Sequence, residues 1–229
     1  MEQLHNGFTL DLTRGGFPLS TDSMVLSGFV RLTRDARVLD LGSGSGTLGL
    51  LLCAADSGCH VTGIELDENA HAAALENIQR NGLQTRLESI CADLRGLSQL
   101  VTPGSFTACV SNPPYFSSGP ASTAHTAARR EDNCTLEDIF AAAAWAVKFG
   151  GDFFLVHRPE RLGEIFTCAS RHNMEPKRLC LVRHSPDAPV NLVLIQCRKG
   201  AKPGLLWEDL ILRNCDGTPT EAYRKLYHL

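Results

Sequence analysis

Long apolar runs are absent from the sequence: no window approaches the roughly 20 apolar residues that a membrane-spanning helix needs. The first twelve residues also lack the basic start and the apolar centre of a secretory signal. Nine cysteines are present, but none forms a C-x-x-C pair, which argues against a disulfide framework or a zinc ribbon. We therefore expect a cytoplasmic protein with reduced thiols, no metal and no membrane contact.

A strong charge of either sign is also missing. The net charge of -3 and the pI near 6.2 argue against a protein that coats nucleic acid. Residues 158–202 depart from this average, because basic residues outnumber acidic ones there. The basic residues are Arg158, Arg161, Arg171, Lys177, Arg178, Arg183, Arg198, Lys199 and Lys202. A solvated surface and a patch that contacts phosphates are both consistent with this excess.

The composition excludes disorder and low-complexity architectures, since 43% of the residues are hydrophobic and 21% are charged. A length of 229 residues predicts one domain. We expect an N-terminal segment at 1–36, a central domain at 37–200 and a C-terminal extension of the same domain at 201–229. The polar residues 117–134 have the composition of a loop, which we expect to face the substrate.

Strand and helix patterns alternate along the chain. Apolar segments predict strands at 37–41, 60–65, 86–91, 106–111, 152–157, 177–183 and 191–197. Periodicity and capping residues predict helices at 47–55, from the cap Asp67 to a stop at Asn81, at 135–148 and at 160–171. This alternation predicts a doubly wound α/β fold with a mostly parallel, seven-stranded sheet whose last strand is antiparallel. A strand at 210–213 and a helix at 220–227 would form the small extension.

A glycine-rich loop joins the first predicted strand to the first predicted helix, in the string Asp40-Leu41-Gly42-Ser43-Gly44-Ser45-Gly46. Glycines let the backbone approach a ligand closely, and the following helix start favours an anion. That anion could be a pyrophosphate or the carboxylate of a methionine group. Glu65 ends the next strand, where a carboxylate accepts both ribose hydroxyls. An NAD site and a site for S-adenosylmethionine (SAM) both have these features.

The tetrad Asn112-Pro113-Pro114-Tyr115 follows the fourth predicted strand and indicates the chemistry. An amino nitrogen conjugated to an aromatic ring is a poor nucleophile, because its lone pair is delocalised. The side-chain oxygen of Asn112 and the carbonyl oxygen of Pro113 are uncharged acceptors for its two N–H groups. The two prolines restrict the backbone, so the acceptors are held at low entropic cost. Tyr115 offers a ring on which a planar base or amide can stack.

This arrangement resembles the class I SAM-dependent methyltransferases, which have a Rossmann-like fold. The similarity is carried by DLGSGSG (40–46), GIELD (63–67), CADL (91–94) and SNPPYF (111–116). It implies that the loop residues Asp40, Gly42, Gly44 and Gly46 hold the methionine end of SAM, that Glu65 binds the ribose, and that Asp93 binds the adenine amino group. Leu66, Leu94 and Asn112 are expected at the same cofactor site. Asp93 is also suited to cap a following helix.

The remainder resembles one branch of that class, the bacterial tRNA (adenine-N6)-methyltransferases acting on the purine beside the anticodon of valine tRNA. Matching stretches are FPLSTDSMVL (17–26), AARRED (127–132), VHRPERL (156–162), EPKRLCLV (175–182), CRKGAKPG (197–204) and DGTPTEAYRKLY (216–227). The resemblance implies that Leu19 and Thr21 belong to a segment that closes over the cofactor. The tRNA would be contacted by Tyr115, Phe116, Arg129 and Arg130. We expect a monomer.

Three alternatives remain open at this point. Glutamine-N5 methyltransferases of release factors share the N-P-P-Y chemistry but have a substantial helical domain before the glycine loop, where this chain has 39 residues before Asp40. A noncatalytic scaffold that binds SAM or RNA would be expected to lose the tetrad or the loop. An NAD oxidoreductase would leave the tetrad without a function.

Overall fold

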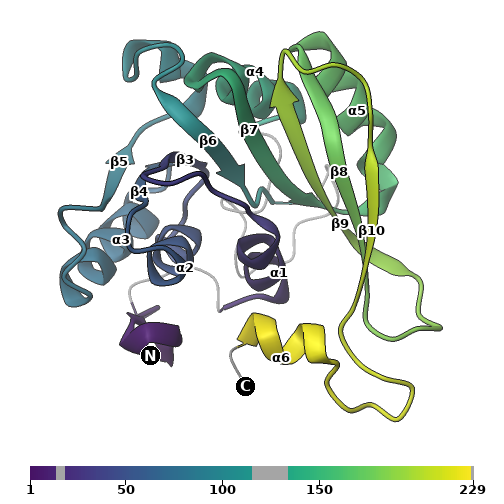
Figure 1. Cartoon of the computed structure of the whole chain (residues 1–229). Coiled ribbons are helices and arrows are strands. Elements are labelled where there is room, and N and C mark those ends of the chain that lie inside the picture. The colour runs from purple at the N-terminus through teal and green to yellow at the C-terminus, as the bar shows by residue number, and fades with distance from the viewer. Residues whose placement is uncertain (14–18, 115–133, 228–229) are drawn as a thin grey trace, which may run out of the picture.

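A computed structural model describes residues 1–13, 19–114 and 134–227 of the chain (Figure 1). Its centre is an eight-stranded sheet with the strand order β10-β8-β9-β7-β6-β3-β4-β5. The strands are β3 (Arg37–Leu41), β4 (His60–Glu65), β5 (Leu87–Cys91), β6 (Phe106–Ser111), β7 (Val147–His157), β8 (Met174–Arg183), β9 (Val190–Lys199) and β10 (Leu206–Ile211). Only β9 runs against its neighbours among these eight, since it pairs antiparallel with both β7 and β8. The predicted doubly wound, mostly parallel fold is confirmed.

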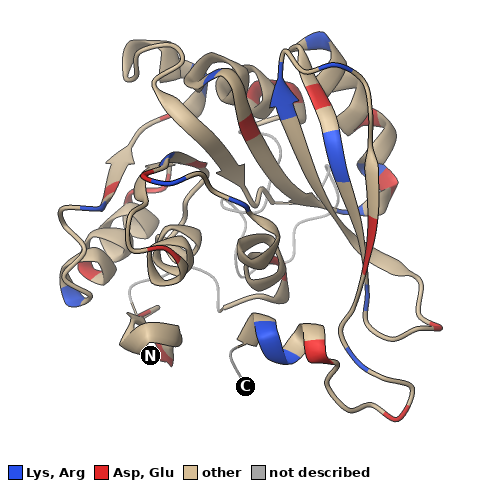
Figure 2. Ribbon diagram, viewed as in Figure 1, with Lys and Arg blue, Asp and Glu red and all other residues tan. Residues whose placement is uncertain are grey.

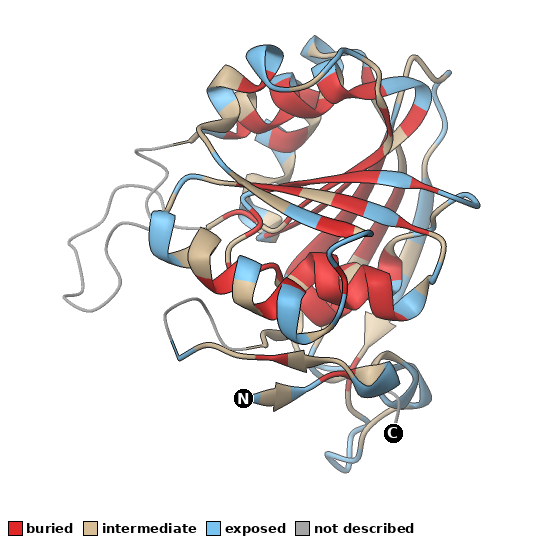
Figure 3. Ribbon diagram, turned by 90° about the vertical axis from the view of Figure 1, so that its left-hand side faces the viewer, coloured by how far each residue is buried: buried red, intermediate tan, exposed pale blue. Residues whose placement is uncertain are grey.

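Helices cover both faces of this sheet (Figures 1 and 3). They are α1 (Thr21–Phe29), α2 (Thr47–Ala55), α3 (Glu68–Arg80), α4 (Leu136–Ala146), α5 (Leu162–Arg171) and α6 (Glu221–Tyr227), with short 3-10 turns η1 (His5–Gly7), η2 (Leu94–Gln99) and η4 (Pro159–Arg161). Helices α1, α2 and α3 pack on one face, and α4 and α5 pack on the other. Because side chains alternate along a strand, Phe154 enters the first core while Phe153 enters the second and meets Phe140 edge-on at 5.1 Å. A small hairpin of β1 (Glu2–Gln3) and β2 (Thr9–Leu10) stands apart from the sheet.

Local capping chemistry sets two helix starts as predicted. The Asp67 side chain accepts a hydrogen bond from the Ala70 amide at the start of α3. Thr135 and Asp138 form a reciprocal capping box at the start of α4. That helix ends at Ala146, however, and the predicted extension to Lys148 is wrong. Val147 already pairs with Phe106, and Gly150, with φ of 76°, lets β7 continue through a bulge.

The C-terminal extension departs from the prediction in its strand. The strand is Leu206–Ile211 instead of 210–213, and it pairs in parallel with β8. It adds an eighth strand to the predicted seven by pairing with the edge of β8 that does not face β9. Helix α1 had no counterpart among the predicted helices, although Ser20 caps it by accepting from the Ser23 amide. The division into 1–36, 37–200 and 201–229 stays a prediction.

In the described part of the chain, no helix combines the length and the apolar character that crossing a membrane requires. The segment 117–134, expected to face the substrate, lies outside the described residues except for Cys134.

Candidate active site

The carboxyl ends of β3, β4 and β6 bring the predicted site residues to one edge of the sheet. The chain leaves β3 for β4 and β5 on one side and returns to β6 on the other side. This change of direction makes the β3–β6 boundary a topological switch point, where open α/β sheets bind ligands. Asp40 pairs with Gly63 on one neighbour and with Val110 on the other. The glycine loop, Glu65 and Asn112 therefore lie at the same edge of the sheet.

The glycine loop and Glu65 are tied together by backbone hydrogen bonds. The Gly44 amide donates to Glu65 Oε2 at 2.7 Å, and the Asp67 amide donates to Oε1 at 2.8 Å. Both carboxylate oxygens are thereby oriented and keep lone pairs for further donors. Gly42, Gly44 and Gly46 all have positive φ, at 74°, 55° and 83°, so the loop conformation requires residues without a Cβ. Gly46 immediately precedes α2.

Asp40 is an acid buried at the base of this loop. It is 1% exposed, and among the described residues no donor lies within hydrogen-bond distance of either carboxylate oxygen. Burial, with a smaller contribution from the negative charge of Glu65, raises the pKa of Asp40 to about 8. The buried Ser43 hydroxyl likewise has no partner in the described part of the chain. A ligand that brings a cation and polar hydrogens to the loop would satisfy both groups.

Asp93 lies beside Glu65, since the Ala92 amide donates to the Glu65 carbonyl oxygen at 2.8 Å. Its carboxylate caps η2 by accepting from the Arg95 amide and also pairs with the Arg95 guanidinium, at 2.9 Å from Nε to Oδ2. This contact with Arg95 lowers the pKa of Asp93. The predicted capping role is confirmed, and the contact with adenine stays a prediction. Leu66, 47% exposed, and the partly buried Leu94 follow the two acids.

Asn112 follows β6 directly and is partly buried, and Pro113 is buried. The Asn112 Nδ2 donates to Ser23 Oγ at 3.1 Å, which places the first turn of α1 against the predicted catalytic residue. Thr21 begins that turn, and Leu19 precedes it with its amide donating to Glu2 Oε2 at 3.1 Å. The predicted site residues Tyr115, Phe116, Arg129 and Arg130 lie outside the described residues.

Two residues of the site were not identified from the sequence. Ser23 contacts Asn112 across 89 positions of the chain, a distance over which the sequence carries no signal. Asn77 is fully buried on α3, where it donates to the Ser45 carbonyl oxygen at 3.1 Å and accepts from the Asp11 amide at 2.8 Å. It thereby joins the glycine loop to the N-terminal segment. A polar residue next to Ile78 on the apolar face of a predicted helix was a signal that could have revealed it.

Seven of the nine basic residues of 158–202 lie on η4, α5, β8 and β9 (Figure 2), while Arg158 precedes η4 and Lys202 follows β9. Many of the arginines pair with acids within the fold: Arg161 with Glu164, Arg171 with Glu137, Arg178 with Glu208, Arg183 with Asp209 and Arg198 with Asp152. The Lys199 ammonium donates to the carbonyl oxygens of Ala144 and Val147. These contacts give much of the segment a structural function, and its contact with RNA stays a prediction.

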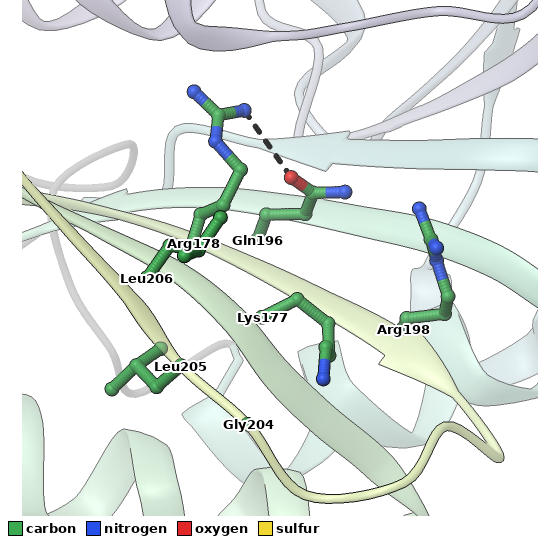
Figure 4. Close-up of a pocket in the computed structure, with 7 residues that line it drawn as sticks. All are labelled: Lys177, Arg178, Gln196, Arg198, Gly204, Leu205 and Leu206. Atoms are coloured by element: carbon green, nitrogen blue, oxygen red, sulfur yellow. Dashed lines mark hydrogen bonds between the residues drawn. The ribbon is translucent and has the colours of Figure 1, made fainter.

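A groove of about 510 Å³ lies between β8, β9 and β10 (Figure 4). It is lined by Lys177, Arg178, Gln196, Arg198, Gly204, Leu205 and Leu206. None of these residues belongs to β3, β4 or β6, so the groove is separate from the site residues described above.

Several solved structures with a similar fold are methyltransferases. A crystal structure of a predicted O-methyltransferase from Agrobacterium tumefaciens superimposes with a TM-score of 0.77 at 21% identity, over 91% of this chain and 96% of that one. Geranyl diphosphate methyltransferase in complex with SAM matches with a TM-score of 0.59 at 14% identity, over 77% of this chain and 84% of that one. At these identities the similarity concerns the fold alone. The fold is that of the class I methyltransferases.

Sequence relatives narrow this class. The chain belongs to the methyltransferase small domain family, whose profile matches residues 21–164. A tRNA1(Val) (adenine(37)-N6)-methyltransferase of Shewanella halifaxensis is 31% identical over 76% of this chain and 70% of its own length. The protein of the same name from Shewanella sp. strain MR-4 is 29% identical over 96% and 94%, and that of Bacteroides fragilis is 31% identical over 82% and 80%. The chain is therefore an enzyme that uses SAM as methyl donor.

The residues at this edge of the sheet fit the methyl donor. SAM carries an ammonium group, which matches the buried Asp40 carboxylate, and ribose hydroxyls, which match the oriented oxygens of Glu65. The described residues contain no group of three or more histidine, cysteine or acidic side chains that could hold a metal ion.

Proposed function

We propose that the enzyme transfers a methyl group from SAM to N6 of an adenine in tRNA, the purine beside the anticodon of valine tRNA. The observation that carries the proposal is the position of Asn112 and Pro113 at the end of β6, next to the glycine loop. Uncharged acceptors at this place suit an amino group conjugated to a ring. The names of the relatives supply the nucleic acid and the position.

The tetrad acts on the nucleophile. Asn112 Oδ1 and the Pro113 carbonyl oxygen accept the two N–H groups of the adenine amino nitrogen, which favours a tetrahedral geometry and localises the lone pair. SAM supplies an electrophilic methyl group bound to sulfur, and the electrons of that bond stay on sulfur when the methyl group leaves. The methylated nitrogen is then strongly acidic and loses its proton to water. The proposal needs no general base before the transfer. Pro114 keeps the segment rigid, and Tyr115 and Phe116 stack on the base.

The cofactor is held by groups from three strand ends. Asp40 pairs with the ammonium group, Glu65 binds both ribose hydroxyls, and Gly42, Gly44 and Gly46 allow the methionine end to approach the backbone. Asp93 accepts from the adenine amino group, with Leu66 and Leu94 beside the ring. Leu19 and Thr21, at the start of α1, close the methionine end. Because tRNA is modified in the cytoplasm, the proposal places the enzyme there.

The decisive experiment identifies the product. Total RNA from a strain without the gene is incubated with the enzyme and methyl-labelled SAM, and the nucleosides are analysed by mass spectrometry. We expect N6-methyladenosine, located in valine tRNA after hybrid selection and nuclease digestion. The Asn112→Ala variant is the control for a contaminating activity. A label found in protein glutamine, or in a different nucleoside, would contradict the proposal.

A further inference from the structure

Ser23 is a buried serine next to Asn112, and the proposed chemistry gives its hydroxyl no function. It is 6% exposed and lies in the first turn of α1, on the side that faces the sheet. Its Oγ accepts the hydrogen bond from Asn112 Nδ2 at 3.1 Å. The contact joins two segments that are 89 residues apart, so the packing of α1 maintains it.

The position of Ser23 is itself fixed. The Ser20 hydroxyl donates to Ser23 Oγ at 3.3 Å, while the Ser23 amide donates to Ser20 Oγ at 3.2 Å. The helix behind it is anchored in the core, where Val25 and Leu26 are fully buried and Phe29 meets Phe154 edge-on at 6.2 Å. These contacts hold Ser23 Oγ in place, where it accepts from both Ser20 and Asn112.

In the structure, the Nδ2 end of the Asn112 amide faces Ser23. A carboxamide has one acceptor atom, Oδ1, and one donor group, Nδ2. Rotation by 180° about the last side-chain bond exchanges them and would present N–H groups to the donor N–H groups of the substrate amine. With Nδ2 bonded to Ser23, Oδ1 lies on the opposite side of the amide.

We propose that Ser23 is a positioning residue for methyl transfer, which holds the Asn112 amide in the orientation that presents Oδ1 to the amino group being methylated. The inference rests on the proposed function of Asn112. Ser23 acts through Asn112 and touches neither substrate nor cofactor. It affects the step in which the amine becomes nucleophilic, and it does not affect the binding of SAM.

The test compares three variants of the full chain. In Ser23→Ala the acceptor is lost. In Ser23→Thr the hydroxyl is kept. Ser27→Ala is the matched control, because Ser27 lies one turn further along α1 and its hydroxyl donates to the Met24 carbonyl oxygen of the same helix at 2.9 Å. Formation of S-adenosylhomocysteine is followed under saturating SAM with the RNA that the wild-type enzyme methylates, and SAM affinity and melting temperature are measured in parallel.

We expect kcat of Ser23→Ala to fall about tenfold, the effect of losing one buried hydrogen bond at the reacting group, with the SAM dissociation constant and the RNA KM unchanged. Ser23→Thr should recover most of kcat, and Ser27→Ala should equal the wild type. A kcat of Ser23→Ala within twofold of the control would overturn the proposal. So would a parallel loss of SAM binding, which indicates general damage to the fold.

The outcome is separable from that of the proposed function. The identity of the wild-type product decides whether adenine in tRNA is the substrate, whereas the ratio of kcat between Ser23→Ala and Ser27→Ala decides the role of Ser23. The same ratio can be measured on a glutamine substrate if mass spectrometry identifies one.

Discussion

At the scale of single residues, Asp40 and Glu65 are two acids of the same site that differ in burial and in hydrogen-bond partners. Glu65, which is partly buried, accepts hydrogen bonds from two backbone amides. Asp40, at the base of the loop, is almost completely buried, and this burial raises its pKa to about 8. The fold thus keeps in its interior an acid that has no hydrogen-bond partner among the described residues. Such an acid lowers the stability of the ligand-free protein, which indicates that a ligand binds there.

This acid should make the stability of the ligand-free protein fall with pH. The native carboxyl keeps its proton up to about pH 8, whereas the unfolded one releases it above the ordinary value of 3.8. The protonated Asp40 carboxyl therefore contributes its full stabilisation below pH 3.8. This contribution is lost as the pH rises from 3.8 through about 8, by at most about 1.4 kcal/mol per pH unit. Urea unfolding at pH 5 and pH 8 should therefore show that Asp40→Asn gains stability relative to the wild type at the higher pH. An equal difference at both values would refute the raised pKa.

Asn112 carries the second prediction at this scale. Asn112→Ala should lower the rate of methyl transfer by at least ~100-fold, as the loss of one preorganised polar group at a reacting centre does in other enzymes. SAM affinity should hardly change. Single-turnover transfer and calorimetric titration with SAM measure the two effects. A rate near half that of the wild type would exclude Asn112 as an acceptor.

At the scale of elements, the site depends on how closely β4 approaches the glycine loop. A Cβ on Gly63, in the middle of β4, would lie 2.6 Å from Ser43 Oγ and 2.8 Å from Ser43 Cβ. The strand therefore needs a glycine here for the loop to reach its place. Gly49 of α2 is also needed for close packing, because a Cβ there would lie 2.6 Å from Leu87 Cδ1 on β5.

Gly63→Ala should displace the glycine loop. We expect a loss of about 1–3 kcal/mol in the free energy of unfolding, as for other overpacked sites, together with weaker SAM binding. Gly163→Ala is the control, because nothing lies within 4 Å of a Cβ at that position of α5. Chemical denaturation and SAM titration of both variants test this, and unchanged affinity in Gly63→Ala would show that the loop adapts.

At the scale of the whole molecule, Arg178 joins elements that are distant in sequence. Its guanidinium donates to Gln196 of β9 at 3.2 Å (Figure 4). The same group pairs with Glu208 of β10 at 2.7 Å and donates to the Phe29 carbonyl oxygen of α1 at 3.1 Å. It also lies 4.0 Å from the centre of the Phe29 ring. The C-terminal extension and the helix that carries Ser23 are thus held by one side chain.

Replacing Arg178 by alanine should cost about 3 kcal/mol, the lower end of the range for broken buried pairs, because Glu208 is partly exposed. Arg178→Lys should lie between this variant and the wild type, since lysine keeps the charge but lacks the planar fork. Equilibrium unfolding measures both losses, and hydrogen exchange should show faster exchange in β10. Equal stability of all three proteins would mean that apolar packing alone holds the extension.

The sequence by itself determined the features that depend on near neighbours. Local patterns predicted the strand, the glycine loop and the helix at 37–55. They also predicted the caps at Asp67 and Thr135 and the acids and the asparagine at strand ends, because each of these features rests on contacts within a few residues. Their meeting at one edge followed from the parallel order of the strands. Tertiary structure alone decided what α1 contacts, the partner of Asn112 and the burial of Asp40. It also decided the addition of β10 to the sheet. Each of these depends on groups many residues away, whose approach is set by the packing of the two cores and is not encoded in any local pattern.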